Sequence, residues 1–549
     1  MTATDTHTDI DVADQVSANV PSSDGLYRLV ASNDHKMVGR LWIGASMLLL
    51  LAATVLGVVS NIERVSLDSI DVFGDVSTYF QSWALLRTAA IFMVVVPMFI
   101  GIAMVIVPLQ VGSASIAFPR LAAASFWSWL AASGIHIASF LADGGLGPAA
   151  GTNDEGTLLS IVSLGLMILS ILAASVCIAT TVIALRPAGM TLLRVPAFSW
   201  SMLVATSVWL FSLPVLLANL IYAYVDLQGR EPIAFGNPDR LWSSVEWAWS
   251  QPQVYAYAIP VLGILADVVP VTAKQRQANR SVIFSFIGLF GVLSFGAWAQ
   301  HALSRGADPV FADANYIYDE FLYIAFGLAA VLPILAVLGG VADTIRRGSV
   351  PKPGGALIGA LVGTLLLLGA VVAGALRVIP AWDALHEQNE LLSSSTAQLS
   401  LVLAATMAAA IGALVFWSPK IFGGYAAEPL AMLAVVAVLL GGLMAGVADM
   451  VSAFLGQPDI SLVPVSESAV ETMNLLVVIG MALLAIGALA AIGSVATAAS
   501  SDEQLPDDPW DGQTLEWATP SPPPVGNFIE PLEVVTSAEP LIDEFEEVS

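Results

Sequence analysis

Apolar runs separated by short polar stretches fill most of this chain. Each of twelve runs has about 20 residues, which is enough for a helix to cross the ~30 Å hydrocarbon core of a membrane. A backbone in lipid must satisfy its own hydrogen bonds, so such runs adopt helices. The pattern therefore predicts an all-α integral membrane protein, a bundle of twelve transmembrane helices. The predicted spans are 40–60, 84–107, 121–142, 157–185, 200–225, 245–269, 281–303, 317–344, 355–377, 397–417, 430–452 and 470–499.

Polar, acidic segments flank the predicted membrane domain at 40–499. They cover residues 1–39 and 500–549. Segments of this composition are usually solvated and disordered, and we expect both tails to be so. Residues 1–27 lack the positive start and the apolar stretch of a cleavable signal peptide.

The distribution of Lys and Arg predicts the orientation of the bundle. With twelve spans, both termini lie on one side of the membrane. Thirteen of the nineteen Lys and Arg residues fall on that side, and an excess of positive charge marks the cytoplasmic side. We therefore expect cytoplasmic termini, the inner membrane as the location in a bacterium, and the lipid bilayer as a partner.

Composition removes several other classes of protein. The chain is 57% hydrophobic and 11% charged, which excludes a soluble domain. Its formal net charge of -25 excludes a basic nucleic-acid binder, so no nucleic-acid partner is expected. One cysteine, Cys177, excludes a disulfide framework and a cysteine zinc site. The five histidines are His7, His35, His136, His301 and His386, and only His136 and His301 fall inside predicted spans.

Several short strings in the first half of the chain resemble those of a known family. Residues 34–39 read DHKMVG and resemble the phrase DHK-x-I-G. Residues 107–112 and 117–121 read VPLQVG and AFPRL, close to VPLQ-x-G and AFPR-L. These phrases belong to subunit I of the haem–copper oxidases, of the bacterial cytochrome c oxidase type.

Further strings extend the resemblance, in order, to the end of the chain. QPQVY at 251–255 stands where the family has HPEVY, and WAQH at 298–301 stands where it has WAHH. FWSPK at 416–420 resembles WFPK. Segment 507–528 resembles the family's C-terminal tail and is the most specific match, because no membrane constraint generates it. The resemblance implies the family's twelve-helix fold and a place among respiratory-oxidase subunits.

The resemblance also locates the positions that hold the family's two haems. Imidazole serves there because it is a neutral nitrogen donor for iron in a dry interior. Counting eleven residues back from Pro97 places one haem ligand at Leu86. Counting back from Trp417 places the other two at Ala397 and Leu399. None of these side chains can bind iron, so we predict no haem cofactor.

The three copper ligands of the family correspond to Gln251, Gln300 and His301, so His301 is the single surviving position. Amide oxygens are poor replacements for imidazole, and we predict no bound copper. Together with Tyr255, these side chains form a candidate residual polar pocket. Unpaired polar groups in a membrane interior cost on the order of 2–7 kcal/mol each, so we expect the four to hydrogen-bond one another.

Residues that would carry protons in the family are also replaced. The replacements stand at Ser115, Ala122, Ala123, Gln253 and Val337. Charged groups inside a bilayer are retained mainly for function, so their loss is what a scaffold without redox or proton work tolerates. Trp247, Tyr255 and Trp298 match aromatic positions beside the metal site and are expected to pack there.

Other polar residues in the spans have simpler interpretations. We expect His136 to be a hydrogen-bonded core residue and Cys177 to be a small packing residue. We expect Asp319, Glu320 and Asp449 to lie at the membrane interfaces. The volume of two absent haems must be filled to keep a packing density near ~0.75. Collapsed helices, bound lipid and a water-filled cavity all remain open.

Three functions follow from these observations. The first is a redox-inactive relative of oxidase subunit I with a structural, assembly or regulatory role in a respiratory complex. The second is a working terminal oxidase that reduces O2 and pumps protons with haem and copper. The third is a protein that binds or transports small molecules or lipids in the vacated haem cavity. The missing ligands favour the first function. Whether the chain is an enzyme stays open, and the same missing ligands argue against it.

Overall fold

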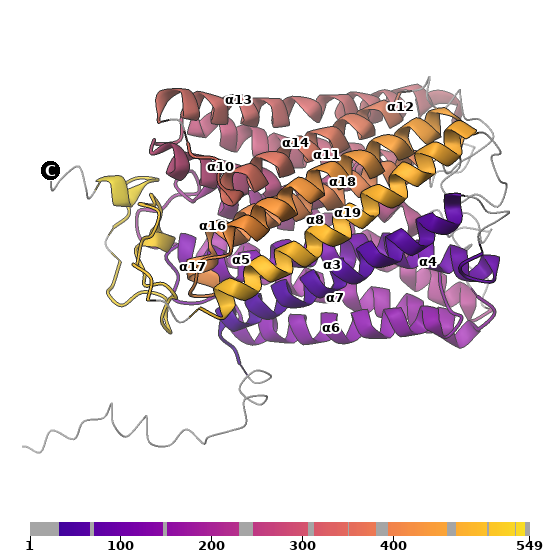
Figure 1. Ribbon diagram of the computed structural model, residues 1–549, viewed down its shortest axis with the longest axis horizontal. Helices are drawn as coiled ribbons and strands as arrows, with labels where there is room; N and C mark the ends of the chain where they lie inside the picture. The colour runs from indigo at the N-terminus through magenta and orange to yellow at the C-terminus, as the bar shows by residue number, and fades with distance from the viewer. Residues whose placement is uncertain are drawn as a thin grey trace, which may run out of the picture.

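Twelve helices in the described part of the chain are long and apolar enough to cross a membrane. They run roughly side by side along one axis (Figure 1). No β-strand occurs among the described residues. The predicted all-α fold with twelve transmembrane helices is therefore confirmed. The computed structural model describes residues 32–65, 71–146, 151–229, 245–305, 312–349, 351–379, 393–457, 468–501, 504–532 and 534–543, without the side chains of 300–305, 312–320 and 393.

Several helices extend beyond the apolar runs from which they were predicted. Four of the first six spans are single helices: α3 (His35–Val65), α6 (Pro119–Leu141), α7 (Asp154–Ala184) and α8 (Ala197–Leu227). The second span consists of α4 (Val76–Ala89), the π-helical turn η1 (Ala90–Val95) and α5 (Val96–Gln110). The sixth span consists of the 3-10 turn η3 (Val254–Ala258) and α10 (Pro260–Ala273). The other six comprise α11 (Arg280–Arg305), α12 (Ala312–Ala329) with α13 (Val331–Arg347), α14 (Gly355–Arg377), α16 (Ser393–Phe416), α18 (Glu428–Phe454) and α19 (Ser468–Ala499). The short elements α17 (Ser418–Ile421) and η5 (Leu515–Trp517) lie outside the spans.

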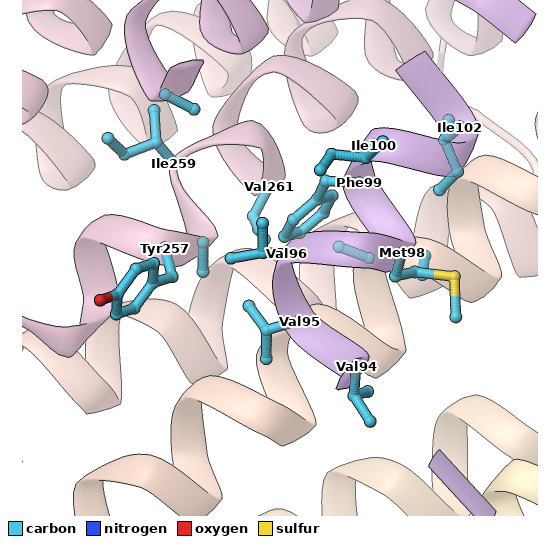
Figure 2. Packing of buried hydrophobic residues seen from close by; sticks show 14 of the residues in the cluster. Val94, Val95, Val96, Met98, Phe99, Ile100, Ile102, Tyr257, Ile259 and Val261 are labelled. Carbon is cyan, nitrogen blue, oxygen red and sulfur yellow. The ribbon is translucent and has the colours of Figure 1, made fainter. Parts of the chain in front are cut away.

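Three of the spans form the centre of the bundle. The most apolar 18 residues of the spans Val76–Gln110, Val254–Ala273 and Ser394–Phe416 are all buried inside the protein. The other nine spans each keep a face that is not covered by protein, as expected for helices that border lipid. Figure 2 shows part of this buried packing, with Val95 and Val96 of the second span and Val261 of α10 among its side chains.

Glycines bring two of the helices into backbone contact. A Cβ atom added at Gly359 of α14 would lie 2.7 Å from the backbone nitrogen of Gly412 in α16. One added at Gly363 would lie 2.7 Å from Cβ of Ala409. Small residues allow such close approach between membrane helices, where van der Waals packing replaces the hydrophobic effect as the driving force.

The N-terminal boundary of the membrane domain differs from the prediction. Helix α3 begins at His35 rather than near residue 40, and His35 and Lys36 are buried. The prediction that His35 lies in a solvated tail is therefore wrong. The imidazole is buried because its two nitrogens lie within hydrogen-bond distance of the Met104 carbonyl oxygen, at 2.8 Å, and of Asn527 Oδ1, at 3.0 Å.

The C-terminal segment is also not a solvated tail where the structure describes it. Residues 504–532 fold back against the end of the bundle where α3 begins, as the yellow segment in Figure 1 shows. Glu516, Trp517 and Asn527 are buried there. The acidic composition of this segment suggested solvation, but specific side chains anchor it instead. The tail residues 1–31 lie outside the described residues.

Asp449 lies near the end of α18, and its side chain is fully buried. Its Oδ1 lies 2.6 Å from Nη1 of Arg64, in the last turn of α3, and its predicted position at a membrane interface stays a prediction. A buried carboxylate needs a charged partner to offset its desolvation, and the partner here is 385 residues away in the sequence. The side chains of Asp319 and Glu320 lie outside the described residues, so their predicted interfacial position stays a prediction.

Candidate functional site

The predicted haem-ligand positions all lie on the central helices. Leu86 belongs to the second span, and Ala397 and Leu399 belong to α16. All three side chains are buried. Leu86 packs near α3 and α19, because a Cβ added at Gly57 of α3 would lie 3.8 Å from Leu86 Cδ2 and would also meet the side chain of Met481. Hydrocarbon and one thioether therefore fill this part of the interior.

Gln398 lies between the other two predicted ligand positions and is fully buried. Its Nε2 donates to the Ala370 carbonyl oxygen at 2.9 Å and to the Pro252 carbonyl oxygen at 2.5 Å. Its Oε1 accepts from Nη1 of Arg377 at 2.8 Å. Arg377 Nη2 in turn donates to the Ser250 carbonyl oxygen at 2.7 Å. One amide thus joins α16 to α14 and to the segment that precedes η3.

The chain is closely packed around this amide. A Cβ atom added at Gly374 of α14 would lie 2.5 Å from Gln398 Nε2, 2.6 Å from the Pro252 oxygen and 3.1 Å from Tyr255 Cε1. Even one methyl group would therefore force a shift. At Gly374, therefore, α14, α16 and the segment before η3 pack closely together.

The residues at the predicted haem positions do not fit a haem. Leu86, Ala397 and Leu399 offer no lone pair to iron. The amide of Gln398 is already hydrogen-bonded to three protein groups. Among the described residues, no group of three or more His, Cys, Asp and Glu side chains could hold a metal ion. The assignment of these positions to lost ligands stays a prediction.

The predicted polar pocket is only partly described. Gln251, just before η3, and Tyr255, within η3, are both buried. The side chains of Gln300 and His301, on α11, lie outside the described residues. The hydroxyl of Tyr255 has no hydrogen-bond partner in the described structure, and the expectation that the four side chains pair with one another stays a prediction. The ring of Tyr255 instead stacks on Phe290, with centroids 5.5 Å apart.

An aromatic cluster lies beside these residues, as predicted for Trp247 and Trp298. Their ring centroids are 4.7 Å apart in an edge-on arrangement. Tyr257, which the sequence comparison of motifs did not single out, packs edge-on against Trp298 at 5.4 Å. Figure 2 shows its hydroxyl pointing away from the apolar packing around Val261. The signal that could have found Tyr257 is its position two residues after Tyr255 in an otherwise aliphatic run.

Two arginine ion pairs lie near helix ends at the end of the bundle opposite the start of α3. Arg87 Nη1 lies 3.5 Å from Glu246 Oε1, and Arg87 Nη2 donates to Thr396 Oγ1 at 3.0 Å. Arg64 and Asp449 form the second pair. The hydropathy pattern did not predict either pair, because each joins spans that are distant in the sequence.

His136 has the role that the sequence predicted. It is fully buried in α6, with Nδ1 2.9 Å from Ser163 Oγ and Nε2 3.2 Å from Thr88 Oγ1. Both ring nitrogens are therefore satisfied by hydroxyl groups of neighbouring helices. Cys177 is likewise buried in the core, as expected for a packing residue.

The fold and its central helices define a multi-pass, twelve-span membrane protein of the oxidase subunit I type. Residues 37–483 match the family described as "Cytochrome C and Quinol oxidase polypeptide I". This match covers most of the chain, and the chain belongs to that family, the subunit I family of the haem–copper oxidases. The family resemblance predicted from the sequence strings is therefore confirmed.

Individual relatives agree with this assignment. The chain is 29% identical to the "Probable cytochrome c oxidase subunit 1" of Bradyrhizobium diazoefficiens, over 91% of this chain and 76% of the relative. It is 26% identical to the cytochrome c oxidase subunit 1 of Bacillus subtilis, over 94% and 83%. A solved haem–copper terminal oxidase dimer shares the fold, with a TM-score of 0.65 and 13% identity over 85% of this chain and 84% of that one.

Proposed function

We propose that this chain is a redox-inactive member of the subunit I family. It serves as a structural, assembly or regulatory subunit of a respiratory complex in the bacterial inner membrane, with both termini in the cytoplasm. The observation that carries this proposal is the closed packing at Gln398. The amide holds α14, α16 and the segment before η3 together at the place where the family resemblance puts haem ligands.

Two features of the molecule support a scaffold role. At five of the six positions where the family resemblance places iron and copper ligands, the chain has hydrocarbon or amide side chains, while the twelve-helix fold is kept. The buried charges that do remain have structural partners, as in the Arg64–Asp449 and Arg87–Glu246 pairs. Buried charges are costly, and their pairing here stabilises helix positions without requiring a cofactor.

Purification of the tagged chain from its native membrane tests the proposed role. We expect oxidase-type subunits to co-purify, and we expect Tyr255→Phe to leave the O2 consumption of the isolated complex unchanged. Deleting the chain should instead reduce the amount of assembled complex. Isolation of the chain without any oxidase-type subunit would contradict the proposal, and so would a loss of O2 consumption in Tyr255→Phe.

A second candidate function is the binding of a small polar molecule beside η3. The buried polar atoms of Gln253, Tyr255, Tyr257 and Trp298 favour it, because they have no hydrogen-bond partner in the described structure. Each such group costs roughly 1–3 kcal/mol when unsatisfied. A panel of small uncharged solutes should then raise the melting temperature of the wild type but not of Tyr255→Phe or His301→Ala. Equal effects on all three proteins would remove this candidate.

A further inference from the structure

Residues 504–532, which we call the C-terminal strap, are fastened to the bundle by buried polar side chains. Asn527 Oδ1 accepts from Lys36 Nζ at 3.1 Å and lies 3.0 Å from His35 Nε2. Asn527 Nδ2 donates to the Ser113 carbonyl oxygen at 2.7 Å. The strap therefore contacts the start of α3 and the loop after α5 through one residue.

A second anchor joins the strap to α17. Lys420 Nζ donates to the carbonyl oxygens of Asp507, at 2.7 Å, and of Thr519. The same ammonium group lies 5.3 Å from the ring centroid of Trp517. Trp510 Nε1 donates to the Phe416 carbonyl oxygen at the end of α16, at 2.9 Å. These contacts hold both sides of η5 against the membrane domain.

Glu516, in η5, is the third anchor and differs from the others in its chemistry. Its side chain is fully buried, and Oε1 accepts from Gln110 Nε2 at 3.1 Å. The other oxygen, Oε2, is buried without a hydrogen-bond partner in the described structure. The same Gln110 nitrogen also donates to Asp267 Oδ2 at 2.8 Å. One amide group therefore faces two carboxyl groups.

The two carboxyl groups are not equally supported. Asp267 also accepts from the backbone nitrogens of Ala197 and Phe198, at 2.8 and 3.0 Å, at the first turn of α8. The positive end of a helix stabilises a carboxylate there. Besides Gln110, the Thr514 side chain and the backbone N–H of Glu516 favour an ionised Glu516 carboxyl group. Ionisation would still leave Oε2 buried without a hydrogen-bond partner in the described structure, next to a second negative charge. A proton on Glu516 removes that charge.

The charged groups around Glu516 are Asp267 from α10 and Lys420 from α17, with Arg280 of α11 acting on Asp267. Burial raises the pKa of the Glu516 carboxyl from 4.5 to about 7, and the nearby Asp267 adds to the rise. Burial lowers the pKa of Lys420 from 10.5 to about 8, and the acidic residues Glu516, Asp508 and Asp507 oppose that shift.

We propose that Glu516 is a proton-binding site that fastens the C-terminal strap, which docks with this carboxyl group protonated and loosens when the proton leaves. The strap then responds to the pH of the compartment it faces, and its release would uncover the ends of α5, α10 and α17. This inference goes beyond the proposed function and holds whether or not the chain takes part in a respiratory complex.

The direction of the pH effect follows from the raised pKa. A group that binds its proton more tightly in the docked state stabilises docking at low pH and loses that contribution as the pH rises through the docked pKa. With a pKa of 4.5 when released and about 7 when docked, docking through Glu516 is about twentyfold stronger at pH 5.5 than at pH 7.5. The lowered pKa of Lys420 acts in the opposite direction, because it strengthens docking as the pH rises, but by less than about 1.5-fold between pH 5.5 and pH 7.5.

Hydrogen exchange on the full-length protein in lipid nanodiscs tests the proposal. The readout is the protection factor of the backbone amides in 507–528. This ratio of intrinsic to observed exchange rate corrects for the intrinsic pH dependence of exchange. Backbone amides of Trp517 and Ala518 are suitable reporters, because each donates within η5 at 3.0 Å. We expect wild-type protection to fall about twentyfold between pH 5.5 and pH 7.5, with most of the fall below pH 7 and little change above it.

Two variants assign the effect to this carboxyl group. Glu516→Gln places a neutral amide in the same space, so its protection should be independent of pH and at least as high at pH 7.5 as that of the wild type at pH 5.5. Glu530→Gln, at an exposed position of the strap, should keep the wild-type dependence.

Three results would overturn the proposal. A wild-type protection factor that does not change with pH shows that no proton fastens the strap. A pH dependence that persists in Glu516→Gln assigns the proton to another group, such as Asp267 or His35. Loss of protection in Glu516→Gln at both pH values shows that docking needs the carboxyl group in its charged form.

Discussion

At the scale of single residues, buried polar side chains decide how the interior is closed. Gln398 has three protein partners, and the guanidinium of Arg377 is one of them. Its importance could not be predicted from the sequence, because a lone glutamine in an apolar run gives no indication of its partners. Spacing from Pro97 and Trp417 in the sequence was enough to single out Leu86, Ala397 and Leu399, and their assignment to lost haem ligands stays a prediction.

The first prediction concerns Gln398. Gln398→Leu removes the three hydrogen bonds and leaves the buried Pro252 oxygen unpaired, so we expect the free energy of unfolding to fall by about 2–4 kcal/mol. Thermal or denaturant unfolding of the purified protein in detergent measures this. Gln228→Leu, at an exposed position after α8, is the matched control and should change stability little. Equal stability of the two variants would contradict a stabilising role for the hydrogen bonds of Gln398.

The second prediction concerns the ion pair between Arg64 and Asp449. Asp449→Leu leaves a buried guanidinium without its carboxylate and should cost about 3–5 kcal/mol in unfolding free energy. The double variant Arg64→Met, Asp449→Leu removes both charges and should recover a large part of that loss. If the double variant is as unstable as the single one, the pair is not the source of the effect.

At the scale of elements, hydropathy predicted every span but not how the spans meet. Apolar runs give the existence of a membrane helix, since length and composition suffice for that. They do not show that α14 and α16 touch at Gly359 and Gly412. They also missed the true start of α3, because His35 and Lys36 are polar and become buried only through contacts made elsewhere in the chain.

The third prediction follows from this helix contact. Gly359→Val forces side-chain atoms into the backbone of α16 and should lower the free energy of unfolding by about 1–3 kcal/mol. Gly369→Val lies on the same helix, where an added Cβ meets nothing within 4 Å. That control should be close to neutral in the same unfolding assay. A similar loss in both variants would mean that helix propensity, and not the α14–α16 contact, sets the cost.

At the scale of the whole molecule, the chain keeps the twelve-helix architecture of its family. The strap shows the limit of sequence reasoning at this scale. Its acidic, proline-containing composition predicts a solvated tail, whereas Glu516 and Asn527 are buried by contacts with residues more than 400 positions away. The motif at 507–528 pointed to a family feature, but only the structure gives its contacts.

The haem and copper content of the purified chain tests the central claim most directly. We expect no Soret absorption and no stoichiometric iron or copper when the tagged protein is isolated from its native membrane. The Bacillus subtilis relative, isolated in the same way, serves as the positive control. A content near ~2 haems per chain, the complement of the family, would contradict the account and identify the chain as a working oxidase subunit.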